Sequence, residues 1–206
     1  MRGSTVGPAR ARVGCSGWIY TQWRGDFYPS DLPVSAWFAF YAARFDTVEI
    51  NNSFYRLPEP ATFDAWRAMA PRGFVFSVKA SRYLTHMKKL KDPAEPLDRF
   101  FSHARHLRSR LGPVLYQLPP RWGLDLDRLQ RFLDTLPRRR RHVIEFRDPS
   151  WYVDRVFDAL ERRGVALCLH DMAGSATGRL EVGPFVYVRF HGTTTYGGRY
   201  PDDRLG

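Results

Sequence analysis

Seven short apolar runs, most of them separated by segments with helical spacing, set the strongest constraint on the fold of this chain. The runs have the composition of β-strands and lie at residues 13–16, 47–51, 74–79, 114–118, 142–146, 165–170 and 185–190. Parallel neighbours need long crossovers, usually helices, whereas antiparallel neighbours can be joined by short turns. The alternation therefore predicts an α/β protein with a parallel sheet.

Polar residues in these runs fall on one face, near the carboxyl end of each strand. Five runs carry two of them at a spacing of two residues: Glu49 and Asn51, Ser77 and Lys79, Glu145 and Arg147, Cys168 and His170, Arg189 and His191. Side chains of a strand alternate between its faces, so each pair shares a face. Polar groups at the carboxyl ends of parallel strands are typical of the mouth of a (β/α)₈ barrel. We therefore expect a TIM-like barrel.

The number of strands predicts that this barrel is incomplete. A closed barrel of this type has eight strands and about 250 residues, whereas the chain has 206 residues and seven identifiable strands. We expect residues 13–206 to form a single barrel domain that lacks its C-terminal βα unit. Residues 1–12 should form a disordered N-terminal lead.

The location of the protein is predicted from what the sequence lacks. The N-terminus has no apolar signal-peptide core, and no run of eighteen apolar residues occurs, so we expect no membrane partner. Cys15 and Cys168 lie in separate strands, outside any zinc-type spacing. We therefore expect a cytoplasmic protein with two reduced, unpaired thiols.

A formal net charge of +11 favours anionic partners, either an anionic small molecule or nucleic acid. Almost all of this charge is arginine, a bias that can equally reflect codon composition. The basic run at 138–141 precedes the fifth expected strand. It should therefore form a solvated turn on the face opposite the mouth.

Six stretches of the chain resemble the family known as domain of unknown function 72, or the YecE-like family. They span residues 14 to 205 and read GCSGWIYTQWRGDFYP, FDTVEINNSFYRLP, FVFSVKASRYLTH, LYQLPPRW, EFRDPSW and YVRFHGTTTYGGRYPDDRL. The resemblance implies a TIM-like barrel that usually continues with another strand and helix. It implies no particular activity, since the family has none assigned.

The expected mouth contains candidates for catalysis and for substrate binding. The candidate catalytic residues are Glu49, Glu145, His170 and His191. The candidate substrate-binding residues are Asn51, Tyr55, Lys79, Gln117, Arg147, Trp151 and Arg189. Three cations from three strands suit a phosphate group, and aromatic residues after the strands suit a nucleotide or single-stranded nucleic acid.

Simpler interpretations of individual residues remain open. Glu145 and Arg147 could form a structural ion pair, His170 could be a hydrogen-bonded core histidine, and Asn51 could cap the loop that follows it. Several of the aromatic side chains could pack the rim of the barrel. Together, however, so many polar groups in one place favour a ligand site, because buried polar groups are costly unless they are paired.

The favoured function is an enzyme that acts on a phosphate-containing substrate, by hydrolysis of a phosphoester that could belong to nucleic acid. A divalent metal held by the acidic and imidazole side chains could activate water; without it, Glu145 or His191 could act as a general base. One alternative is a glycosidase-like enzyme that uses Glu49 and Glu145, which needs little cationic crowding between them. The other is a non-catalytic nucleic-acid-binding protein. The sequence leaves the substrate, the metal and the oligomeric state open.

Overall fold

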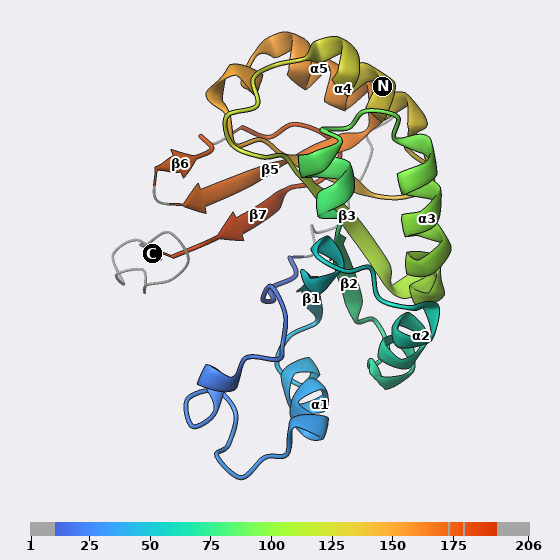
Figure 1. Ribbon diagram of the computed structural model, residues 1–206. Coiled ribbons are helices and arrows are strands. Elements are labelled where there is room, and N and C mark those ends of the chain that lie inside the picture. The colour runs from blue at the N-terminus through green and yellow to red at the C-terminus, as the bar shows by residue number, and fades with distance from the viewer. Residues whose placement is uncertain (1–10, 173, 179, 193–206) are drawn as a thin grey trace, which may run out of the picture.

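The computed structural model of the protein describes residues 11–172, 174–178 and 180–192. Its sheet is curled, and six of its strands run parallel in the spatial order β1–β2–β3–β4–β5–β7 (Figure 1). These strands are β1 Thr47–Ile50, β2 Val75–Lys79, β3 Leu111–Gln117, β4 His142–Glu145, β5 Val165–Met172 and β7 Tyr187–Phe190. The α/β class and the partial TIM-like barrel are thereby confirmed.

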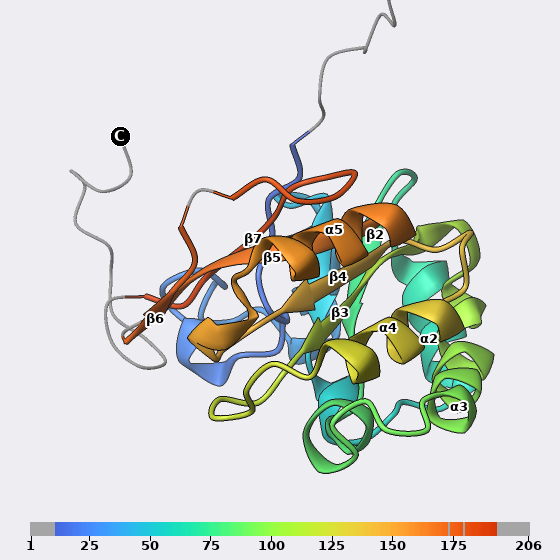
Figure 2. The ribbon, with the colours of Figure 1, turned by 90° about the horizontal axis from the view of Figure 1, so that it is seen from above.

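Helices cover the outer side of this half-barrel, as Figures 1 and 2 show for α2 to α5. The helices are α1 Trp37–Ala42, α2 Pro60–Met69, α3 Ala94–Ala104, α4 Leu126–Thr135 and α5 Asp154–Arg163. Shorter helical turns lie at η1 Thr21–Trp23, η2 Val34–Ala36, η3 Asn52–Phe54, η4 Tyr83–Met87, η5 Arg105–Arg110 and η6 Pro149–Trp151. Among the described residues, no helix is both long enough and apolar enough to cross a bilayer.

Two helix ends show how the sequence sets these boundaries. The Asp125 carboxylate accepts a hydrogen bond from the Arg128 backbone N–H at 3.0 Å and so caps the start of α4. Gly164 ends α5 with a φ of 64°, in the left-handed region that glycine adopts without steric cost. The segments with helical spacing that lie between the strands therefore form helices.

Residues 13–16 differ from the expectation, because they form no strand. The Glu49 N–H donates to the Cys15 carbonyl at 2.9 Å, whereas the Cys15 N–H donates to the Tyr41 hydroxyl at 2.7 Å. The Cys15 N–H thus binds a side-chain hydroxyl, whereas in a β-strand it would bind a backbone carbonyl of the neighbouring strand. The segment therefore runs beside β1 without entering the ladder. Of the expected N-terminal lead, residues 1–10 lie outside the described residues.

A short hairpin occupies the start of the glycine-rich segment after β5. β6, Ser175–Ala176, pairs antiparallel with the end of β5, with Met172 opposite Ser175. Gly174 has a φ of 78°, which allows the tight turn between them. The end of β5 thus continues past the parallel sheet as a two-stranded arm (Figure 1).

The register of the parallel strands aligns their polar ends at one edge. Glu49 lies opposite Ser77, Gln117 opposite Glu145, and His170 opposite Arg189. The two thiols are confirmed as unpaired. The basic run 138–141 is exposed and directly precedes β4, as expected.

Candidate functional site

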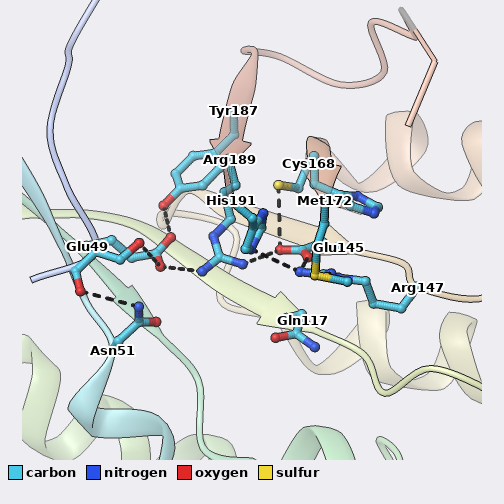
Figure 3. Close-up of polar contacts among 12 residues, drawn as sticks. Glu49, Asn51, Gln117, Glu145, Arg147, Cys168, Met172, Tyr187, Arg189 and His191 are labelled. Atoms are coloured by element: carbon cyan, nitrogen blue, oxygen red, sulfur yellow. Dashed lines mark hydrogen bonds and ion pairs between the residues drawn. The ribbon is translucent and has the colours of Figure 1, made fainter. Parts of the chain in front are cut away.

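Arg189 connects the two sides of the half-barrel at the centre of the candidate site. It extends from β7, donating to Glu49 of β1 at 2.9 Å and to Glu145 of β4 at 2.7 Å (Figure 3). All three side chains are buried, with exposed fractions of 9%, 8% and 0%. Burial opposes the charge of Arg189, but the two carboxylates raise its pKa above the ordinary value. The guanidinium of Arg189 therefore binds a carboxylate that lies 140 positions earlier in the sequence, Glu49.

Arg147 makes a second ion pair with Glu145, on the opposite carboxylate oxygen. Its other contacts are with the Met172 sulfur at 2.8 Å and with Nε2 of His191 at 3.2 Å. Burial would raise the pKa of Glu145, but Arg189 and Arg147 hold it below the usual value. Glu145 is thus ionised and compensated by two arginines. The expected Glu145–Arg147 ion pair exists, as one part of a larger network.

The hydrogen bond between Arg147 and His191 fixes the protonation of this histidine. A guanidinium only donates hydrogen bonds, so Nε2 of His191 accepts. Burial, followed by Arg189, lowers the pKa of His191, so the neutral ring carries its proton on Nδ1. Nδ1 is buried and has no hydrogen-bond partner among the described residues. His191 therefore presents a free donor and no free base.

Lys79, at the end of β2, is a cation that pairs with no carboxylate in the part of the chain that the structure describes. Its ammonium lies 4.2 Å from the centre of the Phe54 ring and makes no ion pair or hydrogen bond with any described residue. Burial first, and then the charge of Arg189, lower the pKa of Lys79 to about 8. The side chain therefore remains mainly protonated at pH 7. It is the candidate cation that a carboxylate does not already neutralise.

Tyr187 belongs to the site although it was not among the predicted residues. Its hydroxyl donates to Glu49 at 2.7 Å (Figure 3). The same hydroxyl lies 2.8 Å from the Ser77 hydroxyl. Tyr187 precedes Arg189 by two residues, so the spacing rule that identified Arg189 also applies to it. Tyrosine is common in apolar cores, and this obscured the signal. Cys168 also joins the network, with its sulfur 3.8 Å from Glu145.

His170 lies at the edge of this network rather than within it. Its Nε2 is 2.8 Å from the Ser175 hydroxyl, and its Nδ1 is 2.8 Å from the Thr177 hydroxyl. Burial is the main cause that lowers the pKa of His170 to about 4, against the attraction of Glu145. Both ring nitrogens are therefore hydrogen-bonded, in agreement with the simpler interpretation of this residue.

Asn51 and Gln117 are two further predicted residues, and both lie beside the network. Asn51 donates to the Ser16 carbonyl at 3.4 Å, and its Oδ1 is buried without a hydrogen-bond partner among the described residues. The side-chain amide of Gln117 donates to the Leu118 carbonyl at 3.1 Å. Both are half-buried at strand ends beside the network (Figure 3).

The two predicted aromatic contacts differ from each other. Tyr55 is 82% exposed and packs edge-on against Phe54. Trp151 is fully buried, stacked 4.8 Å from Phe146, and donates to the Trp122 carbonyl at 2.7 Å. The position of Trp151 therefore supports a role in packing, whereas Tyr55 remains free to meet a ligand.

The two histidines with strongly lowered pKa values predict how stability depends on pH. The pKa of His86 is also lowered to about 4, by burial and then by Lys79. Because the unfolded chain takes up these protons near pH 6.5, the free energy of unfolding should fall as pH drops from 6.5 towards 4. The slope should be at most about 1.4 kcal/mol per pH unit for each histidine, and smaller where solvent screens the ring. Urea denaturation at several pH values measures it.

His170→Gln and His86→Gln provide the comparison for this pH dependence. Each variant should flatten the stability profile between pH 6.5 and 4, since glutamine does not titrate there. A wild-type free energy of unfolding that stays constant or increases as pH drops from 6.5 to 4 would contradict the assignment of two neutral histidines, His86 and His170.

The sequence left a divalent metal open, and the arrangement of the donors does not favour one. Among the described residues, no group of three or more His, Cys, Asp or Glu side chains is arranged to hold a metal ion. Glu49 and Glu145 face arginine instead, and Arg147 occupies the accepting nitrogen of His191. The geometry suits a ligand that brings negative charge rather than a cation.

Comparison with known proteins identifies a family and several relatives. A family model described as protein of unknown function DUF72 matches residues 12–206. The UPF0759 protein YecE of Escherichia coli K12 is 29% identical over 126 residues, which are 61% of this chain and 46% of YecE. The UPF0759 protein YunF of Bacillus subtilis 168 is 26% identical over 152 residues, covering 68% of this chain and 51% of YunF. The chain thus spans about half the length of these curated relatives.

Solved structures share the fold. A DUF72 family protein (TM1631) from Thermotoga maritima MSB8 aligns over 94% of this chain and 83% of its own, with a TM-score of 0.84 and 27% identity. A second DUF72 protein (EF0366), from Enterococcus faecalis V583, aligns over 93% of this chain and 74% of its own, with a TM-score of 0.73 and 18% identity. Since the family model covers almost the whole sequence, this chain belongs to the DUF72 family of proteins of unknown function.

Proposed function

We propose that the mouth of the half-barrel binds a phosphate-containing substrate and that the protein hydrolyses its phosphoester. The observation that carries this proposal is Lys79, a cation that pairs with no carboxylate among the described residues. The charges of Arg189, Glu49, Glu145 and Arg147 all act on its ammonium. Glu49 and Glu145 are bound by arginine, so Lys79 is available for a ligand anion. A phosphoryl group would supply the missing charge and several acceptor oxygens.

Three buried donors of the arginine network support the same ligand class. Nε of Arg147, Nε of Arg189 and Nδ1 of His191 all lack hydrogen-bond partners among the described residues. A buried donor without a partner costs about 1–3 kcal/mol, which an acceptor from a ligand would recover. The carboxylates then act as positioning groups, because they hold the arginines in place rather than meet the anion themselves.

The glycosidase alternative receives less support from the geometry. Both carboxylates contact one guanidinium, so their facing oxygens lie within about 8 Å, inside the usual range for such enzymes. However, Arg189 fills the space between them, and a general acid needs a raised pKa whereas that of Glu145 is lowered. The cationic crowding that would disfavour a glycosidase is present.

Nucleic acid remains a proposed form of the substrate. Lys88, Lys89 and Lys91 follow β2 in the same loop region as Lys79, and the last two are exposed. They could hold the phosphates of neighbouring nucleotides, while Tyr55 stacks on a base. Two unpaired thiols support a reducing, cytoplasmic location, which we also propose.

Sulfate binding tests the role of Lys79, because sulfate keeps its charge throughout the working pH range. Lys79→Met should weaken sulfate binding about tenfold or more in calorimetry, equal to about 1.4 kcal/mol. Wild-type affinity should also fall as pH rises from 7 to 9, since the pKa of Lys79 is about 8. Lys89→Met is the matched control and should bind sulfate like the wild type.

Two outcomes would reject this assignment. Equal sulfate affinity in Lys79→Met and wild type would remove the lysine from the site. Equal losses in Lys79→Met and Lys89→Met would indicate general surface charge instead. Release of nitrophenol from p-nitrophenyl phosphate then tests the reaction, and a short single-stranded oligonucleotide tests the polymeric substrate.

A further inference from the structure

A chain of hydroxyl and imidazole groups runs from the backbone at the end of β4 to the β5–β6 hairpin. The Tyr152 hydroxyl lies 3.0 Å from the Phe146 carbonyl and 3.0 Å from the Thr177 hydroxyl. Thr177 is in turn 2.8 Å from Nδ1 of His170, and Nε2 of His170 is 2.8 Å from the Ser175 hydroxyl. Four hydrogen bonds thus connect a fixed backbone carbonyl to one serine.

The carbonyl end fixes the direction of every hydrogen bond in this chain. A carbonyl only accepts, so Tyr152 donates its single proton to Phe146, and its oxygen accepts from Thr177. With the Thr177 proton used, the Thr177 oxygen accepts from Nδ1–H of His170. A neutral imidazole carries one proton, so its Nε2 is bare and accepts from Ser175.

This arrangement is the one that activates a serine. The hydroxyl of Ser175 points its proton at an unprotonated imidazole nitrogen, and the other nitrogen is held by a fixed partner. Ser175 is partly exposed, whereas His170 is only 3% exposed. The nucleophile is therefore reachable from solvent while its base is shielded.

The serine also adjoins the proposed phosphate site. Ser175 is the register partner of Met172, whose sulfur lies 2.8 Å from Arg147. The charges of Glu145 and Arg147 both act on the ring of His170. A phosphoryl group held by the cluster would therefore approach the hairpin at Ser175.

We propose that Ser175 is a nucleophile that attacks the phosphorus atom of the substrate, with His170 as its general base. The Oγ–P bond forms, the ester P–O bond breaks, and the Ser175 proton passes to Nε2 of His170. His170 returns this proton to the leaving alkoxide, which departs as an alcohol. Water then attacks the phosphoserine, so that phosphate leaves and the Ser175 hydroxyl is restored. This proposal rests on the proposed function, from which it takes the phosphoester substrate.

A biotinylated fluorophosphonate tests the nucleophile in the full chain without any need for anion binding at Lys79. The Oγ–P bond forms as P–F breaks, and the proton is released with fluoride by way of His170. Peptide mass spectrometry of the labelled wild type should place the adduct on Ser175. Labelling of another residue, or no labelling after prolonged exposure, would overturn the proposal.

Variants distinguish activation of Ser175 from a purely structural role of the hydrogen-bond chain. Ser175→Ala should abolish labelling, and His170→Gln should slow it by about 100-fold or more. Tyr152→Phe removes the donor to Phe146 and should slow labelling by about tenfold, which identifies Tyr152 as a positioning residue. Ser150→Ala, which removes a hydroxyl bonded to Asp148, is the matched control and should label like the wild type.

The two proposals fail independently in these experiments. Labelling of Ser175 in a protein that does not bind sulfate would support the nucleophile and reject the anion site. Sulfate binding that depends on Lys79, without labelling of Ser175, would support the anion site and reject the nucleophile. A Tyr152→Phe variant that folds by circular dichroism and labels at the wild-type rate would show that the chain only anchors the hairpin, and would reject the activation.

Discussion

Arg189→Met is expected to lower the free energy of unfolding by about 3–5 kcal/mol, because it leaves two buried carboxylates without their shared partner. Glu49 and Glu145 are almost fully buried, and Arg189 contacts both. Methionine keeps most of the side-chain volume, so the loss of stability is caused by the missing charge rather than by a cavity. Urea denaturation at pH 7 measures the change.

Two further variants make this result specific. Arg163→Met breaks an ion pair with the exposed Asp134 and should cost about 0–1 kcal/mol. Adding Glu49→Gln to Arg189→Met should restore part of the lost stability, since one unpaired charge is removed. Similar small losses in Arg189→Met and Arg163→Met would contradict the bridge between β1, β4 and β7.

Trp151→Ala is expected to destabilise the protein by about 3–5 kcal/mol, the usual cost of removing a large buried aromatic side chain. Trp151 has no exposed surface, stacks on Phe146 and donates to the Trp122 carbonyl. The substitution therefore leaves a cavity and an unpaired carbonyl. Thermal and urea unfolding should both show the loss.

Tyr55→Ala is the comparison, because the same pattern predicted both aromatics as substrate contacts. Tyr55 is 82% exposed, so its removal should change stability by no more than about 0.5 kcal/mol. If it stacks on a base, oligonucleotide affinity should fall instead. A Trp151→Ala protein as stable as Tyr55→Ala would mean that Trp151 is not part of the core.

The sequence predicted the fold class because strand periodicity and crossover length are local properties. Alternating apolar runs and amphipathic segments identified the six parallel strands. The period of two within each strand identified the face on which Glu49, Glu145 and Arg189 lie. It did not predict that residues 13–16 stay outside the ladder. That outcome depends on the Tyr41 hydroxyl, which takes the Cys15 N–H from another part of the chain.

The sequence by itself determined which residues face the mouth, since side-chain parity follows from backbone geometry alone. Only the tertiary structure decided which of them pair. Curling of the sheet brings Arg189 between Glu49 and Glu145, so an arginine that suits a phosphate is engaged by carboxylates. Lys79, in contrast, pairs with no carboxylate among the described residues. Likewise, Trp151 and Tyr55 follow strands in the same way, but one is buried and the other exposed. Pairing and burial depend on distances between residues far apart in the chain, and these exist only once the sheet has curled.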